Sequence, residues 1–265
     1  FPYTTLFRSR VLGNLTTKEF DPILMLDSFD SINPDDYTAG FPMHPHRGIE
    51  TISYVSRGKM VHRDSLGNEA GISDGEVQWM NSGSGIMHEE MVPAAERLLG
   101  VQLWLNLPAK DKMSKPSYNS IKNEDIKEIE IEGGKIRLLA GKYGEHEGYK
   151  GDYLSMDYYD IHLNADAEVT LTMEEDDSVM VFTLLGDVYI DGEHIEEKTA
   201  VKLTEGDSLT IKNGNEKAQV LYMNSRALNE PVAWAGPIVM NTQEELQKAF
   251  LELRSNTFIK ETAEY

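Results

Sequence analysis

The segment SDGEVQWMNSG, residues 73–83, combines a glycine turn, a run of alternating apolar residues and a closing glycine. Such alternation over a short run bounded by turn residues indicates a β-strand with one buried face. The segment TEGDSLTIKNG, residues 204–214, lines up with it without gaps, so that Gly83 falls on Gly214. Two segments with the same order of turn, strand and turn predict that the chain contains a duplicated β-rich unit.

A second match lies upstream of each segment, where YVSRGKM (54–60) has the pattern of FTLLGDV (182–188). Short apolar runs separated by Gly, Asn and Asp clusters surround both matches, as expected for an antiparallel sandwich or barrel. The predicted strands are 23–29, 51–58, 76–80, 98–107, 135–141, 159–163, 168–173, 178–186 and 219–223. We therefore expect an all-β fold.

Changes in composition along the chain suggest its domains. The first strand-rich block spans 10–107, a polar, proline-bearing linker spans 108–130, and the second block spans 131–236. Residues 237–265 are expected to form a C-terminal helix and tail. Within them, Thr242 and Glu245 have capping-box spacing, and an apolar stripe predicts one amphipathic helix. The stripe consists of Leu246, Ala249, Phe250 and Leu253.

The first nine residues, FPYTTLFRS, back-translate without mismatch into TTTCCCTACACGACGCTCTTCCGATCT, which resembles a common sequencing-adapter oligonucleotide. We expect residues 1–9 to be a non-native, adapter-derived segment and not part of the native domain. A continuous natural reading frame through this segment, found by resequencing the gene from source DNA, would contradict this expectation.

Charge and composition exclude several classes of function. With 45 acidic against 25 basic residues, the net charge of −20 disfavours direct binding to nucleic acid. The absence of cysteine excludes disulfides, thiolate nucleophiles and metal–thiolate sites, so any metal must be held by His, Asp or Glu. We find neither a membrane-spanning apolar run nor a secretory signal, and we expect a cytoplasmic protein without a membrane partner.

Two pairs of residues with i, i+2 spacing are candidate metal ligands. His44 and His46 lie in FPMHPHRGIE (41–50), and His88 and Glu90 lie in GIMHEEM (85–91). Residues i and i+2 of a strand point to the same face, so two facing strands could bring the four side chains together. Three imidazoles and a carboxylate suit a first-row divalent ion with positions left for substrate or dioxygen. Spacing alone also allows Glu50 as the carboxylate.

The other histidines are expected to have structural roles. His62 is interpreted as orienting a turn or supporting a ligand from behind. His146, His162 and His194 are isolated in the sequence and are interpreted as surface or core polar residues.

Four segments resemble the pirin family of the cupin superfamily, and the resemblance covers nearly all of residues 11–255. They are HPHRGIET (44–51), HRDSLGN (62–68), VQWMNSGSGIMHEEM (77–91) and EPVAWAGPIVMNTQEELQKAF (230–250). The resemblance implies two tandem cupin (jelly-roll type) β-barrels, of which the N-terminal one holds a metal. It implies the ligands His44, His46, His88 and Glu90, and thus favours Glu90 over Glu50. Glu89, where the family often has Ser, adds a negative charge beside this site.

The resemblance also implies a function. We expect one divalent metal ion per chain, with Fe(II) favoured and Ni, Cu, Mn or Zn as alternatives. Some bacterial pirins resemble quercetin 2,3-dioxygenases, which open the central ring of a flavonol with dioxygen. In that reading the metal binds and acidifies the substrate hydroxyl and Glu90 is the general base. Arg47 and Gln78 either support the ligands or are hydrogen-bonding residues of the barrel. The alternative is a metal-binding regulatory module that docks onto a protein partner, which a basic partner surface would favour.

The duplication gives one further prediction. Each predicted ligand lies at a fixed distance in sequence from Gly58 or Gly83, and the same distances can be counted from Gly186 and Gly214 in the second block. None of the positions obtained is a histidine, so we expect a metal-free C-terminal barrel. The positions obtained are Thr172, Glu174, Gln219 and Leu221.

Overall fold

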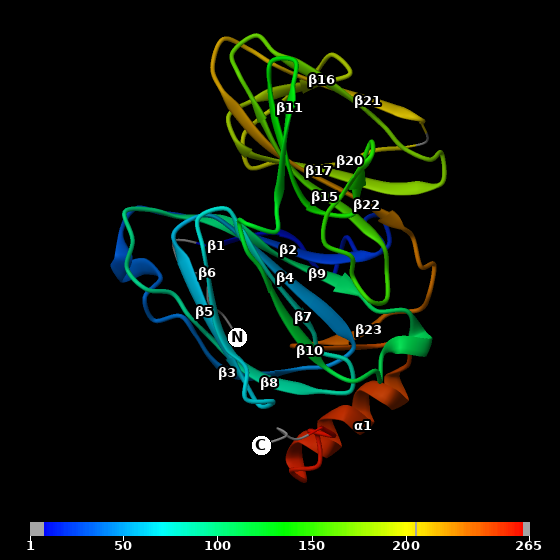
Figure 1. Ribbon diagram of the computed structural model, residues 1–265. Helices are drawn as coiled ribbons and strands as arrows, with labels where there is room; N and C mark the ends of the chain where they lie inside the picture. Colours follow the sequence, from blue (N-terminus) through cyan, green and yellow to red (C-terminus); the bar gives the residue numbers. More distant parts are fainter. Residues whose placement is uncertain (1–7, 205, 262–265) are drawn as a thin grey trace. The chain divides into compact units, whose positions relative to one another are not determined.

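The computed structural model describes residues 8–204 and 206–261, which divide into two compact units (Figure 1). Of the described residues, unit 1 contains 8–18, 23–122 and 228–261. Unit 2 contains residues 19–22 and 123–227. The expected non-native segment 1–9 lies outside the described residues, apart from Arg8 and Ser9 at the start of the first strand.

Unit 1 is built from two antiparallel sheets, a short hairpin and the C-terminal helix. The strand order of its six-stranded sheet is β1-β2-β9-β4-β7-β10, and that of its four-stranded sheet is β3-β8-β5-β6. The elements are β1 (Arg8–Leu12), β2 (Ile23–Ser31), η1 (Pro34–Asp36), β3 (Phe41–His46), β4 (Ile49–Arg57), β5 (Lys59–Asp64), β6 (Glu69–Ser73), β7 (Glu76–Asn81), β8 (Ile86–Met91), β9 (Leu98–Asn106), η2 (Ala109–Asp111), β10 (Ser117–Ile121), β23 (Ala233–Ala235), β24 (Ile238–Met240) and α1 (Gln243–Arg254).

Unit 2 repeats the arrangement of a six-stranded and a four-stranded sheet. Their strand orders are β11-β12-β15-β22-β17-β20 and β16-β21-β18-β19, and β13-β14 form a separate hairpin. The strands are β11 (Lys127–Ile131), β12 (Gly134–Ala140), β13 (Lys142–Tyr143), β14 (His146–Glu147), β15 (Met156–Leu163), β16 (Glu168–Thr172), β17 (Asp177–Leu185), β18 (Val188–Ile190), β19 (Glu193–Ile195), β20 (Ala200–Lys202), β21 (Ser208–Asn213) and β22 (Ala218–Arg226).

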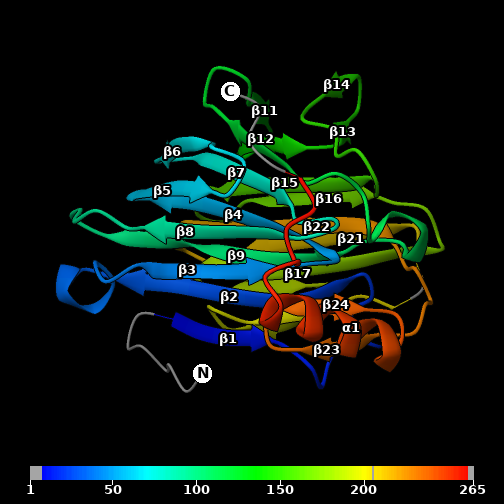
Figure 2. The same cartoon turned by 90° about the horizontal axis from the view of Figure 1, so that it is seen from below.

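The predicted all-β class with one C-terminal helix is confirmed. The helix begins with the predicted capping box, in which Thr242 and Glu245 each bond the other's backbone N–H. Leu246 and Ala249 of its apolar stripe are buried, and they pack against residues of β23 and β24. Helix α1 lies beside these two strands (Figure 2). Among the described residues, no helix has the length and apolarity needed to cross a membrane.

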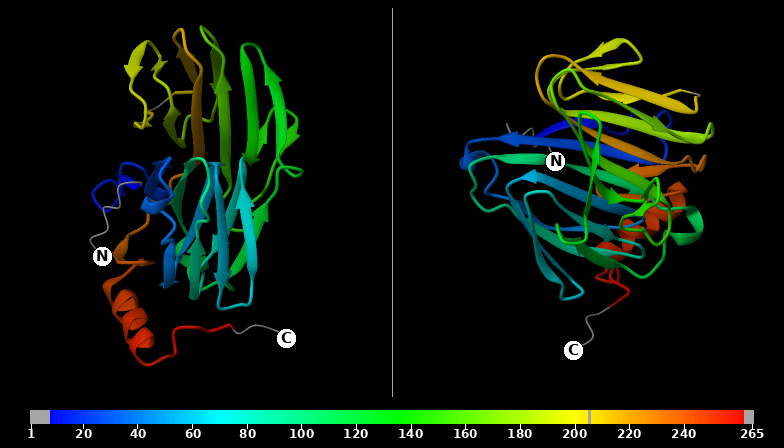
Figure 3. Two further views of the ribbon diagram at one scale, coloured as in Figure 1. Left: turned by 90° about the vertical axis from the view of Figure 1, so that its left-hand side faces the viewer. Right: turned by 45° about the horizontal axis from the view of Figure 1, so that its top comes forward.

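The division of the chain differs from the one expected from composition. The segment interpreted as a linker, 108–130, contains β10, which pairs with β7 of unit 1, and the start of β11, which pairs with β12 of unit 2. Both are edge strands, and such strands tolerate the polar, charged composition that suggested a linker. The expected separate segment 237–265 lies in unit 1, where the orange-to-red C-terminal part runs beside the blue strands (Figure 3).

The alignment between the two blocks holds at one place and is wrong at the other. Gly58 joins β4 to β5, and Gly186 joins β17 to β18 in the same way, both with positive φ. However, β7 belongs to the six-stranded sheet of unit 1, whereas β21 belongs to the four-stranded sheet of unit 2. The sheet orders instead make β20 the counterpart of β7, and β21 the counterpart of β8. Similar glycine turns precede many strands, so the gapless match paired strands from different sheets.

A buried lysine connects the C-terminal hairpin to the first strands of unit 1. The Lys112 side chain is 1% exposed, and its ammonium group donates to the carbonyls of Gly48 and Val239 and to Oδ1 of Asn106. The three N···O distances are 2.8, 3.1 and 2.7 Å. These acceptors come from three separate segments, so Lys112 holds together the chain that follows the candidate ligand His46.

Replacing Lys112 should therefore destabilise unit 1. We expect Lys112→Met to lower the free energy of unfolding by at least about 2 kcal/mol, because three buried oxygens lose their hydrogen-bond donor. Urea unfolding followed by circular dichroism measures this. The exposed neighbour Lys110 provides the control, since Lys110→Met should change stability by less than about 0.5 kcal/mol. Equal effects of the two substitutions would contradict the role given to Lys112.

Candidate metal centre

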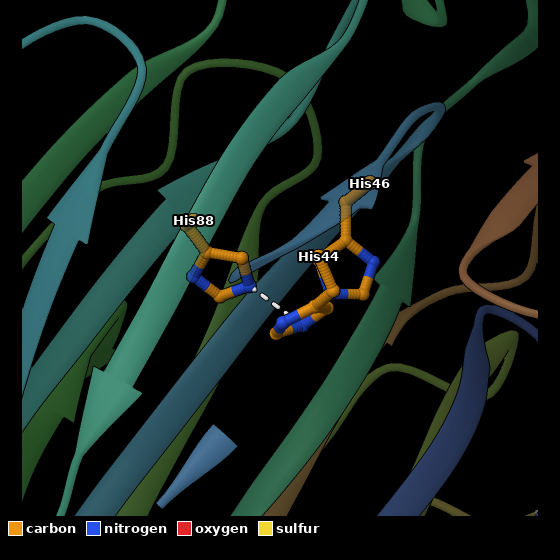
Figure 4. Close-up of side chains that lie close together, drawn as sticks. All are labelled: His44, His46 and His88. Carbon is orange, nitrogen blue, oxygen red and sulfur yellow. Dashed lines mark hydrogen bonds between the residues drawn. The ribbon is translucent and has the colours of Figure 1, made fainter. Parts of the chain in front are cut away.

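Three of the four predicted ligands converge in unit 1. His44 and His46 lie on β3, and His88 lies opposite His44 on the paired strand β8. The Nε2 atom of His44 is 3.0 Å from Nε2 of His46 and 3.0 Å from Nε2 of His88. Ring nitrogens of all three lie within 4.8 Å of one another, and the rings gather at one point (Figure 4). The i, i+2 spacing and the pairing of two strands thus produce the cluster.

The hydrogen bonds on the far side of two rings fix where their protons lie. Nδ1 of His44 is 2.8 Å from the carbonyl oxygen of Pro42, and Nδ1 of His46 is 3.0 Å from that of Pro237. A carbonyl only accepts, so each Nδ1 carries the proton and donates it. In the neutral imidazoles each Nε2 then has a free lone pair, and both lone pairs face the centre of the cluster.

Burial keeps two of the rings neutral. Burial lowers the pKa of His46 to about 3, and the nearby His44 lowers it further, while the bond to Pro237 opposes the shift. Burial also lowers the pKa of His88 well below its ordinary value, and the neighbouring histidines add to this shift. At neutral pH both side chains are therefore imidazoles, the form in which histidine binds a metal ion.

The donor set fits a divalent metal ion. Lone pairs on nitrogens only 3.0 Å apart repel one another unless a cation lies between them. A first-row ion bound at about 2.0–2.1 Å from each imidazole nitrogen would satisfy all three. The histidine triad can thus hold one metal ion, and imidazole ligands are compatible with Fe, Ni, Cu, Mn or Zn.

Glu90 lies in a neighbouring network. Its side chain is buried on β8, and its carboxylate accepts hydrogen bonds from the amides of Gln78 and Gln102. Both amides also donate to Oγ of Ser53, at 3.3 and 2.9 Å. Among the described residues the group of clustered ligand atoms contains the three histidines and no carboxylate. Glu90 as a fourth ligand therefore stays a proposal.

The other side chains considered from the sequence take different positions. Gln78 contacts Glu90, as its interpretation as a supporting group requires. Arg47 points away from the triad: its guanidinium donates to the carbonyls of Ser84 and Phe258 and pairs with Glu252 of α1. Glu50 is buried on β4 and is outside the clustered group.

Several supporting residues were not predicted. Gln102 is one of two polar residues, with Asn106, in the apolar run LLGVQLWLNL, and this contrast is a signal that could have been used. Asp64 repeats the i, i+2 spacing with His62, so the pattern that found the ligands also fits this pair. The carbonyl of Pro237 had no sequence signal, because it lies 191 residues from His46 and any residue carries a carbonyl.

The corresponding strands of unit 2 carry different kinds of side chain on their buried face. On β16 and β21, the counterparts of β3 and β8, the buried residues are Asn213, whose side chain bonds the backbone of Ala167 and Glu216, and four aliphatic residues that belong to the hydrophobic core of that unit. These four are Val169, Leu171, Leu209 and Ile211.

The offsets carried over from sequence gave other positions. Gln219 and Leu221 rested on the incorrect strand match. Thr172 and Glu174 came from the match of Gly58 with Gly186, but the connection from β16 to β17 (173–176) is longer than that from β3 to β4 (47–48). Thr172 and Glu174 are exposed, and Leu221 is buried on β22.

These strands support the prediction of one metal ion per chain. Protein loaded with excess Ni²⁺ or Zn²⁺ and then dialysed should retain about one equivalent, because aliphatic side chains offer no ligand atom. Inductively coupled plasma mass spectrometry measures the ratio, and His88→Ala should reduce it. Two equivalents per chain, or no change in His88→Ala, would overturn the assignment.

The lowered histidine pKa values predict a shallow pH dependence of metal binding. Protons compete with the metal only for ligands that titrate, and the lowered pKa values of His46 and His88 weaken this competition below neutral pH. The affinity should therefore fall much less steeply than the roughly thousandfold per pH unit expected if all three ligands titrated. Chelator competition at several pH values measures this slope. A fall of a hundredfold or more per unit would show that two or three ligands titrate.

Comparisons with known proteins agree with the fold. The family model described as Pirin matches residues 5–105, and the model described as Pirin C-terminal cupin domain matches residues 158–259. A Pseudomonas aeruginosa protein named "Putative quercetin 2,3-dioxygenase" is 38% identical over 93% of this chain and 90% of its own length. Human Pirin is 36% identical over 93% of this chain and 86% of its own.

A solved structure gives the same result. The crystal structure of a quercetin 2,3-dioxygenase from Acinetobacter baumannii superposes with a TM-score of 0.86 and 32% identity, covering 94% of this chain and 90% of that one. The expected fold of two cupin domains is thereby confirmed. The chain belongs to the pirin family.

Proposed function

We propose that this protein is a metal-dependent dioxygenase that opens the central ring of a flavonol such as quercetin. The observation that carries the proposal is the convergence of three imidazole Nε2 atoms beside a buried carboxylate. The names of the P. aeruginosa and A. baumannii relatives support the same reaction class. The proposed ligands are His44, His46, His88 and Glu90, and Fe(II) is the favoured metal.

In this proposal the bound divalent ion supplies a Lewis acid that lowers the pKa of the substrate hydroxyl and holds the substrate in place. Pro42 and Pro237 fix the rings of His44 and His46 through their carbonyls, so these side chains need no rearrangement during turnover. The triad thus supplies a preorganised set of neutral donors.

Glu90 would accept the proton of the flavonol hydroxyl. The amides of Gln78 and Gln102 donate hydrogen bonds to its carboxylate and orient it. A shift of the carboxylate from these amides towards the triad would bring it to the substrate or to the fourth ligand position. Its burial excludes water that would otherwise compete for the proton.

Quercetin turnover tests the proposal. Wild-type protein loaded with Fe(II), and in parallel with Ni(II), Cu(II) or Mn(II), should consume one O2 for each quercetin lost. Absorbance and an oxygen electrode follow the two reactants. We expect His44→Ala and Glu90→Ala to reduce the rate at least about a hundredfold, because a ligand and a general base are lost. The exposed His194 of unit 2 gives the control, and His194→Ala should keep the wild-type rate.

The regulatory alternative predicts a different outcome. Metal-loaded wild-type protein would then show no quercetin loss with any of these metals, and affinity purification would recover a specific protein partner. The absence of turnover in protein that demonstrably holds one metal equivalent would overturn the dioxygenase proposal.

A further inference from the structure

Behind His88, away from the cluster, lies a second histidine that the proposed reaction does not use. Nδ1 of His88 is 3.3 Å from Nδ1 of His62, and the His62 side chain is 0% exposed. The two nitrogens face each other, so one must donate and the other must accept. His88 therefore differs from the other two ligands, whose Nδ1 atoms face backbone carbonyls.

The far side of His62 indicates which nitrogen donates. Nε2 of His62 is 2.8 Å from Oδ2 of Asp64, whose carboxylate is also buried. Asp64 additionally accepts from the backbone N–H groups of Leu66 and Asn68 and from the Asn68 amide. Burial raises the pKa of Asp64, but the hydrogen bonds from His62 and Asn68 outweigh it and lower the pKa overall. The carboxylate accepts at every contact, so Nε2 of His62 carries a proton.

The remaining protons follow in sequence. For His88 to offer a lone pair at Nε2, where it meets His44, its proton must lie on Nδ1. Nδ1 of His88 then donates, and Nδ1 of His62 must accept. This requires His62 to be protonated on Nε2 alone, the tautomer that Asp64 selects. With the lone pair of His88 at Nε2, this arrangement satisfies both the contact of Asp64 with His62 and the contact of His62 with His88.

Packing fixes the ring of His62 in the same orientation. The ring of Tyr118 on β10 stacks on it, with centroids 4.0 Å apart and planes inclined by 13°. β5 carries both His62 and Asp64, and it pairs with β8 so that Asp64 lies opposite His88. The pair is therefore held by strand register on one side and by an aromatic ring on the other.

We propose that Asp64 and His62 are a positioning pair that fixes the tautomer and orientation of His88 and thereby sets the affinity of unit 1 for its metal ion. This inference rests on the proposed metal centre and adds two residues to it. Hydrogen-bond partners behind metal-bound histidines commonly change metal affinity by 10- to 100-fold.

Two substitutions at position 62 distinguish the effect of losing the hydrogen-bond acceptor from the effect of changing the size of the side chain. In His62→Gln the amide oxygen can still accept from Nδ1 of His88, whereas His62→Leu offers no acceptor of similar size. We expect His62→Leu to weaken Zn²⁺ binding about 10- to 100-fold and His62→Gln to stay within a few-fold of wild type. In Asp64→Asn the amide would face hydrogen-bond donors at either oxygen position, so we expect a loss similar to that in His62→Leu.

The matched control is the exposed pair of unit 2, in which Nε2 of His194 lies 3.1 Å from Oδ2 of Asp187. Asp187→Asn should leave Zn²⁺ affinity unchanged. Dissociation constants come from chelator competition, and thermal unfolding of the metal-free proteins identifies any variant that has lost its fold. Wild-type affinity in both His62→Leu and Asp64→Asn would overturn the proposal.

Nitrogen-15 NMR of metal-free protein labelled at histidine provides a readout that needs neither metal nor activity. We expect the proton of His88 on Nδ1 in wild type, and on Nε2 in a substantial fraction of Asp64→Asn, with signals assigned by means of His88→Gln. A proton on Nε2 of His88 in the wild type would overturn the positioning role. A wild-type protein with the expected tautomer but no Zn²⁺ binding would instead overturn the proposed metal centre, so the two failures are distinguishable.

Discussion

The convergence of three imidazole lone pairs is the constraint on which the structure of unit 1 depends. Ring nitrogens 3.0 Å apart can direct their lone pairs at one point only if a hydrogen-bond acceptor behind each ring fixes its orientation. These acceptors are the carbonyl of Pro42, the carbonyl of Pro237 and Nδ1 of His62. One is two residues from its histidine, one is 26 residues away, and one is 191 residues away. Local sequence, sheet pairing and the return of the C-terminus thus each orient one ring.

The return of the C-terminal segment explains why the region after the second block belongs to unit 1. Pro237 bonds His46, Val239 accepts from Lys112, and Glu252 of α1 pairs with Arg47. The guanidinium of Arg47 also lies over the ring of Phe258, at 4.2 Å from its centroid. These contacts surround the end of β3, so the segment that follows unit 2 completes the environment of a candidate ligand rather than forming a separate tail.

The two units share one arrangement of sheets but differ in the side chains that lie between the sheets. In unit 1 the paired strands β3 and β8 place imidazoles and a carboxylate between the sheets, and glutamines hold the carboxylate. In unit 2 the corresponding strands β16 and β21 place aliphatic side chains there, and these join a continuous hydrophobic core. A buried polar interior is stable only when its groups are paired, which explains the dense hydrogen bonding around Glu90 and Asp64. The fold alone therefore does not determine the chemistry.

The sequence by itself determined the features that depend on local periodicity. Alternation of apolar residues located nine strands, apolar spacing and the capping box located α1, and i, i+2 spacing identified the histidines that converge. It failed where a pattern is shared by many strands, as with the pairing of 73–83 and 204–214, and where edge strands have the composition of a linker. Only the tertiary structure decided which strands are counterparts, which acceptor lies behind each ring, and that Glu90 is held by Gln78 and Gln102. These are contacts between distant segments, and their geometry depends on sheet register and chain return, which no short stretch of sequence encodes.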